Sequence, residues 1–182
     1  MTLAPLSLDD LAELEPVALD PDLWRWTPTA VRTPDDLRAY VERALDEQRR
    51  GVSLPFVLRD GATGRAAGST RYANVSARDR RVEIGWTWVG RAWQRTAMNT
   101  EAKYLLLRHA FETLGCVRVE LKTDALNERS RAAIRRIGAT EEGTLRRHTR
   151  TDSGRMRDTV YYSILDDEWP GVKAQLERKL ER

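Results

Sequence analysis

The residues from Gln94 to Thr100 carry the clearest chemical signal in this sequence. They follow a strand predicted to end near Val89 and lead into a helix predicted from about Ala97 to Leu114. The first amide groups of a helix have no partner within the helix, and with the helix dipole they bind anions. The segment could therefore hold a pyrophosphate without a charged side chain. Taken alone, it favours a simpler interpretation, a surface loop before a core helix.

The order of predicted elements determines where this loop lies. Cap residues and apolar spacing predict helices after Ser7 and from Thr33 to Gly51, followed by strands at Phe56–Leu58, Ala67–Val75 and Val82–Trp88. The remaining elements are the helix at 97–114, a strand at Val117–Leu121, a helix at 127–137, two strands at about 140–150 and 155–165, and a last helix from Trp169 to Leu180. A strand–helix–strand unit requires a parallel pair with a right-handed crossover, whereas hairpins give antiparallel neighbours. We therefore expect one domain over residues 1–182, of the α/β (α+β) class, with a mixed central sheet of about six to seven strands flanked by helices.

The strand before the loop has a strict alternation of side chains. Val82, Ile84, Trp86 and Trp88 are spaced to share one face, and core packing is the favoured interpretation of the two tryptophans. The same alternation predicts that Glu83 faces away from Ile84, together with Gly85 and Thr87.

Composition excludes several classes of protein. The 182 residues are 41% hydrophobic and 32% charged, as expected of a water-soluble globular domain. The single Cys116 allows neither an intrachain disulfide nor a zinc cluster of cysteines. No window has about 18 uninterrupted apolar residues, and the first ten residues do not resemble a secretory signal, so we expect a cytoplasmic protein with no membrane partner.

Arginine dominates the basic residues. Among the 31 lysines and arginines, the only lysines are Lys103, Lys122, Lys173 and Lys179. Arginine pairs well with phosphate, but 28 acidic residues balance the charge and no run of five or six basic residues occurs. A solvated surface is favoured over a nucleic-acid interface.

The region from Glu83 to Tyr162 resembles the GNAT superfamily of N-acetyltransferases, and within it the branch of ribosomal-protein N-terminal acetyltransferases. The loop after Val89 is similar to the family's Gln/Arg-x-x-Gly-x-Gly/Ala motif, with Ala97 and Asn99 at the two glycine positions and Thr100-Glu101 following. The segment Asp124-Ala125-Leu126-Asn127, with Ser130 and Ile137-Gly138 after it, matches the family more closely. We expect that the alanine keeps the backbone approachable and that Asn99 tolerates unusual dihedral angles.

The resemblance implies acetyl-CoA as the acetyl donor and a gap in the sheet. The strand ending near Val89 would diverge from the strand at Val117–Leu121, and the pantetheine arm would pair with the exposed backbone of the first strand. The cofactor contacts implied are Thr87, Trp88, Val89, Gln94, Arg95, Thr96, Ala97, Met98, Asn99, Thr100 and Asn127. Asn127 also suits a helix cap, and both roles are compatible.

Acetyl transfer to an amine needs a neutral nucleophile and a proton for the departing thiolate. The tyrosine that many family members use as the acid is replaced by Ile134, and the resemblance to the ribosomal branch implies that Ser130 takes its place, as the thiolate acid or as a hydrogen-bond donor. Ser130 could instead be an ordinary helix-surface serine. Glu83 is the candidate base and Glu120 its rival, although either could be a solvated structural carboxylate and water could serve as the base.

Other polar and aromatic residues are weaker candidates. Trp24 and Trp26 lie in a loop-like segment and are candidate walls of the acceptor pocket, with core packing as the equal alternative. His109, His148 and Cys116 are interpreted as structural. No metal site is expected, because no His and acidic residues occur at ligand spacing.

The sequence therefore predicts an acetyl-CoA-dependent N-acetyltransferase, an acyltransferase of groups other than aminoacyl groups. The acceptor would be a primary amine, on a small molecule or a protein N-terminus, attacking the thioester directly. A catalytically inactive CoA-binding or sensor domain and, third, a basic nucleic-acid-binding module are the alternatives. The resemblance makes a homodimer plausible.

Overall fold

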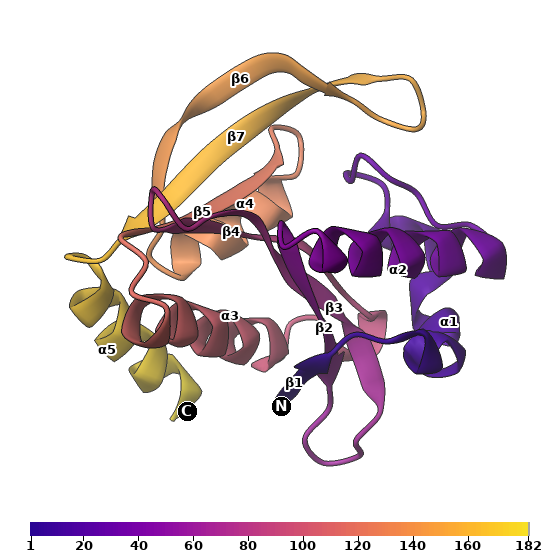
Figure 1. Ribbon diagram of the computed structural model, residues 1–182, viewed down its shortest axis with the longest axis horizontal. Coiled ribbons are helices and arrows are strands. Elements are labelled where there is room, and N and C mark those ends of the chain that lie inside the picture. The colour runs from indigo at the N-terminus through magenta and orange to yellow at the C-terminus, as the bar shows by residue number, and fades with distance from the viewer. Residues whose placement is uncertain (182) are drawn as a thin grey trace.

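A computed structural model describes residues 1–181 and contains one seven-stranded sheet with helices on both faces (Figure 1). The strands are β1 (Thr2–Pro5), β2 (Ser53–Arg59), β3 (Ala66–Ser76), β4 (Arg81–Val89), β5 (Arg118–Asp124), β6 (Thr140–Arg150) and β7 (Met156–Leu165), in the spatial order β1-β2-β3-β4-β5-β7-β6. The helices are α1 (Leu11–Ala18), α2 (Pro34–Arg49), α3 (Met98–Arg108), α4 (Glu128–Arg136) and α5 (Trp169–Leu180). Only β4 and β5 pair in parallel, as the predicted crossover requires, so the mixed α/β architecture is confirmed.

Local signals identified the capping residues correctly. Ser7 and Thr33 each accept a hydrogen bond from a backbone amide and form capping boxes with Asp10 and Asp36. Ser7 caps a short 3-10 turn that precedes α1 rather than α1 itself. The first strand, β1, was not predicted: it is four residues long and acquires strand geometry by pairing with β2. The predicted helix at 97–114 is also divided, because α3 passes into a π-helical turn over His109–Thr113.

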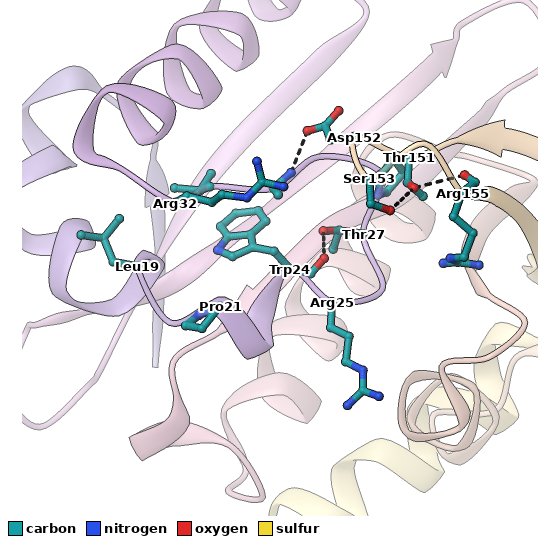
Figure 2. A pocket seen from close by; sticks show the side chains of 13 residues that line it. Leu19, Pro21, Trp24, Arg25, Thr27, Arg32, Thr151, Asp152, Ser153 and Arg155 are labelled. Carbon is teal, nitrogen blue, oxygen red and sulfur yellow. Dashed lines mark hydrogen bonds between the residues drawn. The ribbon is translucent and has the colours of Figure 1, made fainter.

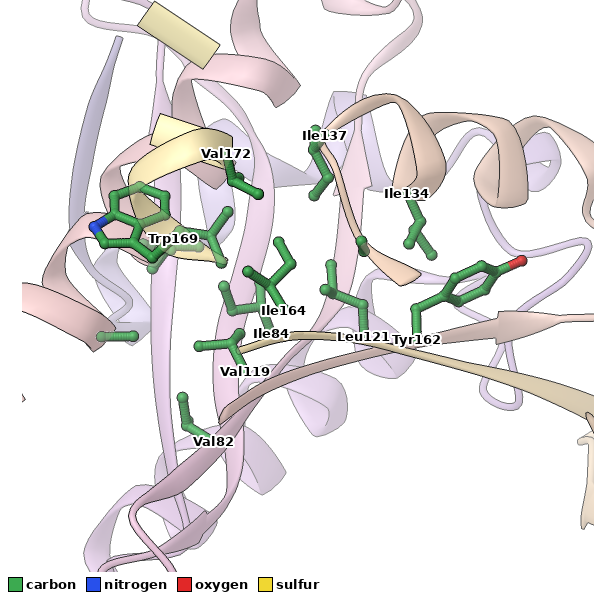
Figure 3. Packing of buried hydrophobic residues seen from close by; sticks show 14 of the residues in the cluster. Val82, Ile84, Val119, Leu121, Ile134, Ile137, Tyr162, Ile164, Trp169 and Val172 are labelled. Carbon is green, nitrogen blue, oxygen red and sulfur yellow. The ribbon is translucent and has the colours of Figure 1, made fainter. Parts of the chain in front are cut away.

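Two apolar layers lie on opposite faces of the sheet. One packs against α3, α4 and α5 and includes Val82, Ile84, Val119, Leu121 and Ile164 (Figure 3). The other lies under α1 and α2 and contains Leu14, Trp24, Tyr40, Val41 and Trp88. The long β6–β7 hairpin extends past the sheet toward the segment between α1 and α2 (Figure 1).

The strict alternation expected along β4 is wrong after Ile84. Trp86 has a positive φ of 49°, and the pairing with β3 shifts between Ser69↔Trp88 and Arg71↔Gly85. This is a β-bulge, which inserts one residue and reverses the side-chain order beyond it. Trp88 consequently packs under α1 and α2, opposite the layer of Ile84, and Trp86 is exposed rather than part of the core.

Candidate active site

A gap in the sheet forms the centre of the candidate site. The parallel ladder joins Arg81↔Arg118, Val82↔Val119 and Glu83↔Glu120, and no pairing continues beyond Glu83 among residues 1–181. β4 nevertheless continues to Val89, so its last six residues make no backbone pairing with β5. The predicted divergence between these two strands is confirmed. An unpaired strand edge of this kind can accept an extended ligand.

The loop from β4 to α3 leads to the far end of this gap. In the part of the chain that is described, Met98 is the one residue from Thr96 to Thr100 whose amide has a hydrogen-bond acceptor, the Thr96 hydroxyl at 3.2 Å. The other amides are available to an anion, and Thr96 and Ala97 are exposed. Gln94 donates from Nε2 to the Val89 carbonyl at 2.8 Å, which fastens the loop to the end of the strand.

The two residues at the family's glycine positions need no glycine here. Ala97 has φ −67° and ψ −16°, an ordinary helical conformation, and Asn99 lies within the first turn of α3. The expectation that Asn99 must tolerate unusual dihedral angles is therefore wrong. The residue of the loop in the left-handed region is Arg95, with φ 62°. The missing glycines thus leave the conformation of the amides intact.

Lys103 is a buried amine beside the gap that sequence reasoning missed. Its side chain, on α3, is 6% exposed, and Nζ donates to the Thr87 hydroxyl at 2.7 Å. Burial lowers the pKa of Lys103 to about 7, although the nearby Glu83 charge raises it. The sequence contained a signal for this burial, because Lys103 lies at helical spacing from Leu106, Leu107 and Ala110 and so falls on the buried face of α3.

Thr87 lies on the face of α3, contrary to its predicted grouping with Glu83. Its hydroxyl contacts that of Thr70 at 2.7 Å as well as Lys103 Nζ. The bulge at Trp86 is the physical reason, since it turns Thr87 to the opposite side from where simple alternation would put it.

Glu83 faces away from Ile84 as predicted, but it is not solvated. The side chain is 1% exposed, and its Oε2 accepts from Asn74 Nδ2 at 2.6 Å and pairs with Lys122 Nζ at 2.8 Å. Its Oε1 lies beside Gly85, where an added Cβ would come within 2.8 Å of it. The role of Glu83 as a base stays a prediction.

The rival carboxylate, Glu120, belongs to the closed end of the β4–β5 pair. It pairs with Arg118 at 2.9 Å and with Arg81 at 3.6 Å. Both arginines lie at the start of their strands, before the gap opens. Glu83, the last paired residue of β4, is therefore the better placed of the two.

Asn127 and Ser130 lie at the N-terminus of α4, just after β5. Asn127 Oδ1 accepts from the Ser130 amide at 3.0 Å, so its role as a helix cap is confirmed. Ser130 is half-buried, and its hydroxyl has no hydrogen-bond partner within residues 1–181. Ile134, at the position of the family tyrosine, is part of the apolar layer under α4.

The two candidate acceptor-pocket tryptophans have different surroundings. Trp24 is buried, donates from Nε1 to the Ala18 carbonyl at 2.6 Å, and packs against Tyr40 and Trp88 with ring centroids 5.4 and 5.6 Å away. It also borders a cavity of about 410 Å³, so it belongs to both core and pocket. Trp26 is half-buried, with the Arg25 and Arg155 guanidiniums 4.9 and 5.8 Å from its ring.

This cavity lies between the α1–α2 segment and the tip of the β6–β7 hairpin (Figure 2). Asp152 connects the two, because its amide donates to the Pro28 carbonyl at 2.8 Å and its carboxylate accepts from the Ala30 amide at 2.9 Å. Arg25, Arg32 and Arg155 also line it, which gives the cavity a basic wall. Arg155 pairs with Asp124, a fully buried carboxylate at the end of β5 that sequence reasoning missed.

The remaining candidates have ordinary surroundings. His109 stacks on Tyr72 at 6.3 Å, His148 contacts the Tyr161 ring edge-on at 5.7 Å, and burial raises the pKa of the Cys116 thiol. No group of three or more His, Cys, Asp or Glu side chains among residues 1–181 is arranged to hold a metal ion. In the same range, no helix is both long and apolar enough to cross a membrane.

Comparisons with known proteins agree with this geometry. A family model described as "Acetyltransferase (GNAT) domain" matches residues 1–140. Over 173 residues the chain is 32% identical to "Putative ribosomal N-acetyltransferase YdaF" of Bacillus subtilis (strain 168), covering 94% of this chain and 92% of that protein. The chain therefore belongs to the GNAT acetyltransferase family and is an acyltransferase enzyme.

Solved structures support the same assignment. The crystal structure of a "putative acetyltransferase" from T. thermophilus has a TM-score of 0.89 and 38% identity, covering 98% of this chain and 92% of that one. RimJ of Mycobacterium smegmatis, in complex with CoA-disulfide, has a TM-score of 0.84 and 26% identity, covering 97% and 88% of the two chains. The resemblance inferred from the sequence is thus confirmed at the level of the family.

Proposed function

We propose that this enzyme transfers the acetyl group of acetyl-CoA to a primary amine by direct attack of the amine on the thioester. The observation that carries the proposal is the gap between β4 and β5, which begins beyond Glu83 and lies between the free amides before α3 and the aromatic face under α1 and α2. Names of relatives support it, since RimJ of M. smegmatis was solved with CoA-disulfide and the B. subtilis relative is called a ribosomal N-acetyltransferase.

The chain offers groups that fit each part of the donor. The amides from Thr96 to Thr100 and the N-terminus of α3 would hold the pyrophosphate. The unpaired edge of β4 from Thr87 to Val89 would bond to the amide groups of the pantetheine arm, and Asn127 would contact the acyl end. The Val89 carbonyl already accepts from Gln94, so Gln94 sets the position of that edge.

Proton transfer requires two further roles. When bound, the donor supplies an activated carbonyl carbon and a thiolate leaving group. Ser130 would donate a hydrogen bond to that sulfur as the C–S bond breaks, and the thiolate that leaves would take its proton from water, directly or through the Ser130 hydroxyl, which water then reprotonates. The attacking amine must lose one proton as the C–N bond forms, to Glu83 or to water.

Thiol release in the presence of an amine panel tests the proposal. The enzyme should release free thiol from acetyl-CoA only when an acceptor amine is present, and millimolar acetyl-CoA should raise its Tm. A rise in Tm without thiol release would favour the inactive CoA-binding domain. No rise in Tm would exclude both functions. That the enzyme is a cytoplasmic homodimer stays a prediction.

A further inference from the structure

Arg157 is a buried cation on the face of the sheet under α1 and α2. Its side chain on β7 is 6% exposed, and its guanidinium makes no hydrogen bond or ion pair within residues 1–181. Val160, Tyr162 and Ile164 of the same strand belong to the layer under α3, α4 and α5 (Figure 3). Because side chains alternate along a strand, Arg157 faces the opposite side, that of α1 and α2.

The other buried or partly buried cations of this face each have a carboxylate. Lys122 pairs with Glu83 at 2.8 Å, Arg71 with Glu47 at 3.0 Å, and Arg155 with Asp124. Burial lowers the pKa of the Arg157 guanidinium, while Asp124 and Glu83 raise it. Those two carboxylates already serve other cations. A buried cation without its own partner is unfavourable for stability, so Arg157 suits an anion that comes from outside the chain.

The unsatisfied buried atoms of this face have one chemical property in common. Within residues 1–181, the buried side-chain nitrogen and oxygen atoms without a partner are Tyr40 Oη, Arg71 Nε, Trp88 Nε1, Arg157 Nε and Thr159 Oγ1. All five can donate a hydrogen bond, and the three nitrogens can only donate. They lie on α2, β3, β4 and β7, on the face under α1 and α2. A surplus of donors matches a ligand rich in acceptor oxygens.

Thr159 narrows the chemistry of that ligand. It is 1% exposed, lies two residues from Arg157 on the same side of β7, and pairs across the ladder with Asp124, the last residue of β5. A guanidinium and a hydroxyl on the same side of the strand can bind both oxygens of one carboxylate, whereas a neutral carbonyl group offers one oxygen and no charge to offset that of the guanidinium. Arg155, which lines the basic cavity (Figure 2), lies two residues before Arg157 and pairs with the same Asp124.

We propose that the acceptor is a primary amine that carries a carboxylate, and that Arg157, assisted by Thr159, binds that carboxylate. This inference rests on the proposed acetyl transfer and specifies its acceptor. The carboxylate can belong to a free amino acid or to an acidic residue at a peptide N-terminus. The two sources offer the same group to Arg157.

Two matched acceptor pairs distinguish these sources. The first pair is alanine and alaninamide, and the second is a short amidated peptide that begins with Asp and its counterpart that begins with Asn. In at least one pair the wild-type enzyme should prefer the carboxylate by about 10- to 100-fold in kcat/KM, the range expected of a hydrogen-bonded charge pair. Equal kcat/KM within both pairs would overturn the proposal.

The variant Arg157→Gln tests the residue itself. It should lose the preference and leave kcat/KM for the amide member of the pair within about threefold, since that member makes no ion pair. Its Tm should not fall, because the substitution removes an unpaired buried charge. Arg150→Gln, which changes an exposed arginine of β6, is the matched control and should behave as wild type. A variant that keeps the preference, or loses both activities equally, would refute the assignment.

A binding measurement makes the inference independent of turnover. At least one of two products, N-acetylalanine or the N-acetylated amidated peptide that begins with Asp, should raise the Tm of the wild-type enzyme more than its amide counterpart does, and Arg157→Gln should abolish that difference. If no amine supports thiol release but this difference is present, acetyl transfer fails while the carboxylate site stands. If thiol release occurs and the difference is absent, the carboxylate site fails alone.

Discussion

The two faces of the sheet use buried side chains in opposite ways. The face under α3, α4 and α5 is filled by aliphatic and aromatic residues such as Val119, Leu121 and Ile164, with Lys103 as its buried amine. The face under α1 and α2 buries Arg71, Glu83, Asp124 and Arg157 among its tryptophans. Burial of apolar area stabilises a fold, whereas burial of charge costs free energy unless each group has a partner. The first face is thus an apolar support, and the second is the face that buries most of the ionisable groups.

The largest effect is expected from breaking the supporting face. Leu121→Ala removes a buried side chain from its centre and should lower the free energy of unfolding by about 2–5 kcal/mol, through lost burial and the cavity left behind. Chemical denaturation measures this loss. The preference for carboxylate acceptors should persist at a temperature where the variant is folded. If the preference changed, the two faces would not be separable in this way.

The next effect concerns the chemistry at the open end of the gap. Ser130→Ala should reduce kcat by about 100-fold or more, with little change in KM, because an acid that acts only in the transition state is removed. Glu83→Gln should lower activity by less if water can take the amine proton. Steady-state kinetics across pH measures both. A change of no more than several-fold in either variant would exclude that residue from proton transfer.

Lys103 allows a test of the charge buried on the supporting face. Its pKa of about 7 in the fold lies below the ordinary value of 10.5, so between these pH values the unfolded chain binds more protons than the folded one. The contribution of Lys103 to the free energy of unfolding should therefore increase with pH, by up to about 1.4 kcal/mol per pH unit in that window. Below about pH 7 both states carry the proton and the contribution no longer changes.

Lys103→Met should remove this pH dependence and increase stability most at low pH, where the wild-type amine is charged. Denaturation of both proteins from pH 6 to pH 10 measures the difference between their free energies of unfolding. Contributions from groups present in both proteins, such as Cys116, cancel in this difference. Lys173→Met is the matched control, because Glu112 raises the pKa of Lys173 and no proton is exchanged in this window. A parallel pH dependence in wild type and Lys103→Met would mean that the amine keeps its ordinary pKa in the fold.

The smallest effect is expected at the loop before α3. Ala97→Gly restores the family's glycine, yet Ala97 already has an ordinary helical conformation. The variant should change the affinity for acetyl-CoA by less than about threefold and lower stability by at most about 1 kcal/mol, through added backbone freedom. Titration calorimetry and thermal melting measure these values. A large gain in affinity would mean that the alanine methyl group blocks the phosphates.

The sequence predicted well those features that depend on neighbouring residues. The caps at Ser7, Thr33 and Asn127 are hydrogen bonds to amides two or three positions away, so residue type and spacing suffice to find them. The strand–helix–strand order required a parallel pair, and the resemblance to a known family predicted where that pair diverges. What it could not predict is β1, which becomes a strand by pairing with β2 about fifty residues away.

The ion pairs across the sheet could not be predicted from the sequence either. Glu83 and Lys122, like Asp124 and Arg155, lie about thirty to forty residues apart and meet because β4, β5 and β7 are neighbours. Many arginines and carboxylates in the sequence could have formed other pairs, and the unpartnered state of Arg157 emerges only once these pairs are assigned.

The sequence by itself determined the helix caps and the free amides before α3, because short-range sterics and hydrogen bonds govern both. The tertiary structure alone decided the bulge at Trp86, which reverses the faces of Thr87 and Trp88, and the burial of Lys103 beside the gap. It also decided that Arg157 has no carboxylate partner among residues 1–181, since burial and pairing depend on which strands the fold brings together.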